Sequence, residues 1–156
     1  MTGKLIGGLI VGFALIAGVS IYYLQVYAYY MTLAPEDVDI RLTSVALQEP
    51  EPIRTDAMAA IDSDSSPLRF RACFETPRSL AALTEQFVIY DAAEPLNAPN
   101  WFDCFDAETV GLALERGEAI AFLGERDIHD GVDRVVAVFD DGRAYAWHQL
   151  NETYQD

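Results

Sequence analysis

The two cysteines, Cys73 and Cys104, are the residues whose chemistry depends most on where the chain resides. In an oxidising compartment they would form a disulfide that closes a loop of about 30 residues and stabilises the fold by roughly 3–4 kcal/mol in the chain-entropy model. Free buried thiols are a second interpretation. A redox-active pair is the third, and it is disfavoured because such cysteines usually stand close together in the sequence. A structural disulfide is therefore the expectation if this part of the chain lies outside the cytosol.

Two histidines are the other candidate ligands. His129 lies in an aspartate-rich stretch, residues 127–133, that offers oxygen and nitrogen ligands for a metal. The spacing does not fit an EF-hand loop, so we expect a solvated turn there. His148 is expected on a strand and half exposed, and the spacing gives no support to a metal site shared by the two histidines.

Motifs for catalysis and cofactor binding are missing from the sequence. It contains no GxSxG, HExxH, P-loop, GxGxxG, CxxCH or zinc-binding pair. Aromatic residues could line a ligand pocket, but we expect them mainly in the core: Trp101, Phe102, Phe105, Tyr145 and Trp147. We therefore assign no catalytic, cofactor-binding or metal-binding residue and expect no cofactor.

A hydrophobic segment precedes all of these residues. Residues 5–24 carry no charge, and 20 helical residues cover the ~30 Å hydrocarbon core of a bilayer. Tyrosines follow, as is typical of the headgroup layer. Residues 1–31 are therefore predicted to be a transmembrane anchor with the lipid bilayer as partner. A signal peptide cleaved near Val26–Ala28 is the alternative, and it is disfavoured because the apolar run exceeds 7–15 residues.

The charged residues that flank this span predict its orientation. Lys4 precedes the span, and no further basic residue appears until Arg41. The positive-inside rule then places the N-terminus in the cytosol and the remaining chain outside it.

Small residues recur along the span at helical spacing. Gly8 and Gly12 form one small-xxx-small pair, and Ala14 and Gly18 form another. Such pairs let two helix backbones approach closely, so they are candidates for packing against a second copy or another membrane protein. The alternative is that glycine is simply common in membrane helices.

The chain beyond the span is strongly acidic. It holds nine arginines and all 25 acidic residues, a formal charge of −16. This charge repels nucleic acid and permits a basic protein surface as partner. The alternative is that the acidity only keeps the domain soluble.

The local patterns predict an α+β fold with one N-terminal transmembrane helix, a largely antiparallel sheet and one or two helices. Residues 32–67 are expected to be a tether with one short strand candidate, and residues 68–156 an acidic domain. Helices are predicted over 79–86 and 106–117, with Ser79 and Asp106 as caps. A hairpin turn is predicted at Asp141-Gly142, and a polar loop over 125–133. Strands are predicted over 68–75, 87–90, 118–124, 134–139 and 143–149.

The chain resembles a family of uncharacterised single-span membrane-anchored proteins of alphaproteobacteria. The resemblance rests on the Met-Thr-Gly-Lys start at 1–4, the glycine-rich span, residues 68–74 (LRFRACF) and residues 140–149 (DDGRAYAWHQ). It implies a bacterial inner membrane and a periplasmic domain, and it assigns no site residue.

The first functional hypothesis is a non-enzymatic accessory or docking component of a membrane complex. A periplasmic ligand- or metal-sensing domain is the first alternative, and a thiol-redox protein is the second.

Overall fold

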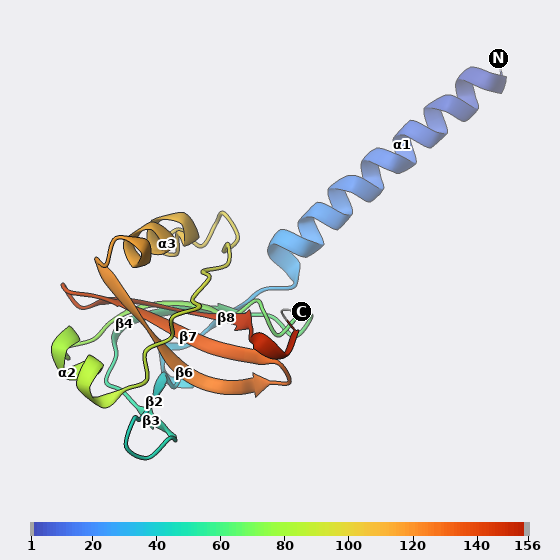
Figure 1. The fold of residues 1–156 in the computed structure, drawn as a ribbon. Coiled ribbons are helices and arrows are strands. Elements are labelled where there is room, and N and C mark those ends of the chain that lie inside the picture. The colour runs from blue at the N-terminus through green and yellow to red at the C-terminus, as the bar shows by residue number, and fades with distance from the viewer. Residues whose placement is uncertain (1, 155–156) are drawn as a thin grey trace.

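The computed structural model describes residues 2–154; Met1, at the start of the expected anchor, and residues 155–156, at the end of the expected domain, lie outside the described residues. Helix α1 (Thr2–Tyr23) continues into a π-helical turn, Leu24–Ala28, and together they project from the domain (Figure 1). By length and composition this helix could cross a membrane, and none of the most apolar part is buried. An N-terminal signal sequence would have the same character.

The domain is built on a six-stranded sheet in which every pair of neighbours is antiparallel. In spatial order its strands are β1 (Met31–Leu33), β4 (Asp56–Asp62), β5 (Arg71–Glu75), β8 (Arg143–Leu150), β7 (Val132–Phe139) and β6 (Ala119–His129). A second sheet pairs β2 (Arg41–Thr43) with β3 (Pro50–Pro52). Short 3-10 turns lie at Pro35–Asp37 and Glu152–Tyr154. The predicted α+β class with a largely antiparallel sheet is confirmed.

Two α-helices accompany the sheet, and both begin where the sequence predicts. In α2 (Leu80–Gln86) the Ser79 hydroxyl accepts a hydrogen bond from the Ala82 amide. In α3 (Ala107–Glu115) the Asp106 carboxylate accepts one from the Thr109 amide. Such caps satisfy amides that have no partner within the helix. The predicted hairpin joins β7 to β8, with Gly142 at a φ of +90° that favours glycine.

The sheet separates two hydrophobic clusters, because successive side chains on a strand point to opposite faces. Val136 and Val138 on β7 pack with Leu83 of α2. Val135 and Ala137 on the same strand pack on the other face with Trp147 and Val110 of α3.

Residues 32–67 contain more ordered structure than the expected tether. The structure places β1, β2, β3 and β4 wholly or largely in this range, and β4 lies inside the main sheet between β1 and β5. Strand β4 carries alanines at 57, 59 and 60, a residue with low β propensity, so its pattern gave little signal. The strand forms because Ala59 and Ala60 pair with Cys73 and Ala72 of β5.

Two other local predictions were wrong. The expected polar loop 125–133 is mostly strand, because β6 runs to His129 and β7 starts at Val132. The buried Asp133 carboxylate stabilises this end of the hairpin by accepting hydrogen bonds from the Asp127 amide and the Asn151 side chain. The expected strand 87–90 forms only isolated bridges, Ser44 with Phe87 and Ile89 with Phe122.

Candidate functional site

The junction between the apolar helix and the domain is a cluster of aromatic side chains. The Trp101 indole Nε1–H donates a hydrogen bond to the Val26 carbonyl oxygen at 2.6 Å. Its ring stacks with Tyr27 at 6.4 Å between centroids and meets Tyr30 edge-on at 5.9 Å. The last carbonyls of a helix have no partner within the helix, and here a side chain of the domain supplies one. We call Val26, Tyr27, Tyr30 and Trp101 the junction cluster.

A guanidinium group extends this contact. The Arg69 Cζ lies 5.9 Å from the Tyr29 ring centroid and 5.3 Å from that of Tyr30. One nitrogen of that guanidinium, Nη1, is buried without a hydrogen-bond partner. Cation–π contact with the two rings is therefore the interaction that holds Arg69 against the base of the helix.

Trp101 lies in a segment, residues 91–106, that has no regular structure until α3 begins. Arg71 is buried, and its guanidinium donates to the Leu96 and Asn97 carbonyls at 2.8 and 3.0 Å. The same guanidinium also donates to the Leu68 and Phe70 carbonyls. Burial of the charged group away from water lowers the pKa of Arg71 to about 10. Gln149 fixes the same segment through the Glu94 amide and the Ala92 carbonyl.

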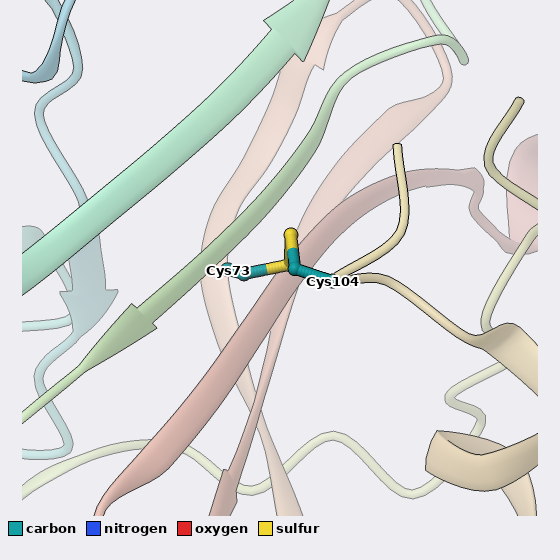
Figure 2. The surroundings of a disulfide bond; sticks show 2 residues. All are labelled: Cys73 and Cys104. Carbon is teal, nitrogen blue, oxygen red and sulfur yellow. A yellow bond between two sulfur atoms is a disulfide. The ribbon is translucent and has the colours of Figure 1, made fainter. Parts of the chain in front are cut away.

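The disulfide joins Cys73 to Cys104 and holds the far end of this segment (Figure 2). Cys73 lies on β5, and its side chain belongs to the cluster that contains Trp147 and Phe105. Cys104 is exposed and stands three residues after Trp101. The structure contains no free cysteine among residues 2–154. The disulfide therefore anchors the segment that carries Trp101 to the main sheet.

The histidines are placed differently from the prediction. His148 is only 1% exposed rather than half exposed, because it faces Phe70 at 4.8 Å between ring centroids. Its Nδ1 lies 2.7 Å from the Pro67 carbonyl oxygen, and its Nε2 accepts a hydrogen bond from Arg134. Burial, followed by the charge of Arg134, lowers the pKa of His148 to about 3. His148 is thus a neutral core residue.

The ring of exposed His129 lies 5.8 Å from that of His148. Both ring nitrogens of His148 already have hydrogen-bond partners, so only His129 of the two histidines could bind a metal ion. Within residues 2–154 no group of three or more histidine, cysteine, aspartate or glutamate side chains is arranged to hold a metal ion.

The expected core aromatics divide into two groups. Trp147 and Phe105 are buried beside Val110 and Val135, and Tyr145 packs against the same cluster. Trp101 instead lies at the junction cluster. Phe102 packs against the buried cluster and also lies edge-on to Trp101 at 6.3 Å. The sequence gave no sign that Trp101 contacts the helix, because the partners are separated by 75 positions.

The helix-packing candidates Gly8, Gly12, Ala14 and Gly18 all lie on the free-standing part of α1. No atom outside the helix lies within 4 Å of a Cβ built on Gly8, Gly12 or Gly18. Their contact with a partner helix stays a prediction.

Comparison with known proteins identifies the family of the domain. No curated protein and no solved structure matches the chain. A family of unknown function (DUF6446) matches residues 40–156, three quarters of the chain. The match begins just before β2 and includes the disulfide and the segment that carries Trp101. The alphaproteobacterial origin stays a prediction. The chain therefore belongs to the DUF6446 family, a family of unknown function.

Proposed function

We propose that this protein is a non-enzymatic docking component of a membrane complex, anchored in the bacterial inner membrane by α1, with its acidic domain in the periplasm. The observation that carries the proposal is the hydrogen bond from Trp101 to Val26, supported by the aromatic contacts around it. A domain attached through a free linker would tumble relative to its anchor. Here the contacts of Trp101 hold the domain against the end of the helix. A docking component needs such a fixed orientation, because it must present the same face to its neighbours.

The junction cluster also supports an uncleaved anchor over a signal sequence. Cleavage after Ala28 would separate Val26 and Tyr27 from Trp101 and leave the indole N–H without its acceptor. A signal peptide that is removed would not be expected to make specific contacts with the mature domain. The Cys73–Cys104 disulfide supports the periplasmic side, because disulfides persist in oxidising compartments.

Two surfaces are available to partners in this proposal. The helix offers its small residues to another helix. The domain, with its excess of acidic side chains, offers a complementary field to a basic protein surface.

Co-purification of the intact chain after extraction in mild detergent tests the proposal. Defined membrane proteins should co-purify, and Gly8→Leu with Gly12→Leu should reduce their recovery by crowding the helix contact. Ala17→Leu is the matched control, because at 3.6 residues per turn it lies on the opposite side of the helix. A chain that runs as a lone monomer, and is unchanged by the glycine substitutions, would contradict the docking role.

The orientation is tested separately in cells. Protease added to spheroplasts should digest the domain of the full chain and leave a cytosolic marker intact. Digestion only after lysis would overturn the periplasmic placement.

A further inference from the structure

The end of the N-terminal helix lies at the depth of lipid headgroups when α1 spans a membrane. The apolar run ends at Leu24, and the helical chain continues for four more residues to Ala28. At ~1.5 Å per residue this extension advances about 6 Å. The headgroup layer on each side of a bilayer is roughly 5–7 Å thick. Tyr29, which follows directly and is 44% exposed, is therefore placed among the headgroups.

The fold holds Arg69 at this same level. Its Cζ lies 5.3 Å from the ring centroid of Tyr30, the second residue after the helical chain. The backbone on either side of it is fixed as well, because the Leu68 and Phe70 carbonyls accept hydrogen bonds from the buried Arg71. The position of the Arg69 side chain is thus set from both ends, by its own backbone and by the tyrosine rings.

The guanidinium of Arg69 has no anionic partner within residues 2–154. Other arginines of this acidic domain form ion pairs with carboxylates: Arg41, Arg54, Arg126 and Arg143. Nη1 of Arg69 is buried, and it is the only buried side-chain nitrogen or oxygen among the described residues without a hydrogen-bond partner. The side chain as a whole is only partly buried, so the rest of the guanidinium can be reached from outside.

We infer that Arg69 binds the phosphate group of a phospholipid in the leaflet that faces the domain. The inference rests on the membrane anchor of the proposed function and adds a lipid contact beside the junction cluster. A guanidinium matches phosphate because it donates two parallel hydrogen bonds to its oxygens. The acidity of the domain disfavours a general attraction to anionic lipid, so the contact is confined to this one cation. A free phosphate ion has the same chemistry, but the depth of the site favours the lipid.

Magnetic resonance on the full-length chain in bilayers of phosphatidylethanolamine and phosphatidylglycerol tests the contact directly. The Cζ carbons of all nine arginines carry ¹³C, and their dipolar coupling to lipid ³¹P is measured. One arginine should show a Cζ–P separation of about 4 Å, as N–H···O distances of about 2.8 Å require. Arg69→Gln should abolish this coupling. Arg116→Gln is the matched control and should retain it, because α3 ends on the side of the domain away from α1 (Figure 1). A parent chain without the coupling, or a coupling that survives Arg69→Gln, would overturn the site.

Lipid affinity separates the two sources of phosphate. The full-length chain is stripped of lipid in a maltoside detergent, which contains no phosphorus, and bound phospholipid is counted by native mass spectrometry. Arg69→Gln should raise the half-saturating lipid concentration at least tenfold, and Arg116→Gln should change it less than threefold. Arg69→Lys keeps a cation beside the tyrosine rings and should give an intermediate loss, because an ammonium binds phosphate as a point charge. Inorganic phosphate that displaces the lipid at equal concentration would assign the site to a free anion and overturn the lipid contact.

The lipid contact, the anchor and the docking role can fail separately. A chain that stays with membranes through an alkaline carbonate wash but shows no coupling to phosphorus would overturn the contact and leave the anchor intact. A chain released by the wash would overturn the anchor and the lipid contact together. A chain that recovers no partner protein but keeps the Arg69-dependent coupling would contradict docking alone and support the lipid site.

Discussion

The contribution of the disulfide to stability is the prediction that the structure defines most sharply. Cys73 and Cys104 are separated by 31 positions. In the chain-entropy model, cross-linking a loop of that length destabilises the unfolded state by about 3.7 kcal/mol. Reduction should therefore lower the free energy of unfolding of the domain by about that amount.

To test this value, the effect of the covalent link must be separated from the effect of the packing of the cysteine side chains. The Cys73 side chain is buried among Trp147, Phe105 and their neighbours, whereas Cys104 is exposed. The reduced protein keeps both sulfur atoms, so the difference between oxidised and reduced protein reports the cross-link. The Cys73→Ala, Cys104→Ala variant also loses the buried sulfur and should lie a further ~1 kcal/mol below the reduced protein.

Urea unfolding followed by tryptophan fluorescence measures all three forms of the full chain in detergent micelles. With a slope of about 2 kcal/mol per molar, reduction should shift the midpoint by roughly 2 M. A loss below about 1 kcal/mol, with the slope unchanged, would refute the reasoning. It would mean that the reduced, unfolded chain retains structure that already restricts the loop between Cys73 and Cys104.

Three further predictions concern Trp101, His148 and Asp133. Trp101→Phe keeps a ring at the junction but removes the donor to the Val26 carbonyl, which should weaken the contact between helix and domain by about 1 kcal/mol. The distribution of distances between spin labels on α1 and on the β7–β8 turn, measured by pulsed EPR, should therefore broaden. An unchanged distribution would contradict a fixed junction. His148 has its pKa lowered by burial, so the unfolded state binds more protons between pH 6.5 and pH 3 and stability falls as the pH drops through that range. The loss should reach about 1.6 kcal/mol between pH 6.5 and pH 5 in urea unfolding. His148→Gln should remove this loss, and the exposed His129→Gln should retain it. Asp133→Ala removes the buried carboxylate that accepts from the Tyr90 hydroxyl and the Asn151 side-chain amide. The free energy of unfolding should fall by about 3 kcal/mol or more in the same assay. A loss no greater than that caused by Asp130→Ala, at an exposed position, would show that the hydrogen bonds of Asp133 contribute little.

The elements that the sequence predicted well are those specified by neighbouring residues. The cap of α2 at Ser79 and the cap of α3 at Asp106 each need a residue three positions away. The β7–β8 turn needs a glycine with positive φ at 142. The pairing of Cys73 with Cys104 could be predicted without knowledge of the fold, because the chain has only two cysteines and an oxidising compartment was expected.

The elements that it missed are specified by distant residues. Strand β4 is alanine-rich and becomes a strand by pairing with β5 and β1 on either side. The end of β6 is polar and is ordered by the Asp133 carboxylate and the Asn151 side chain. In both cases the local pattern resembled a loop, because the stabilising partner lies outside any window along the chain.

Segment 91–106 carries this argument furthest, because residues far along the chain hold it in place. It forms neither helix nor strand, and its prolines at 95 and 99 suit neither element. Its order comes from partners elsewhere in the chain, namely Gln149, Arg71, Cys73 and the Val26 carbonyl. Its middle contacts the end of the N-terminal helix, because Trp101 donates to the Val26 carbonyl. Because the segment is fixed at four places, we expect it to hold the domain in one orientation relative to the helix.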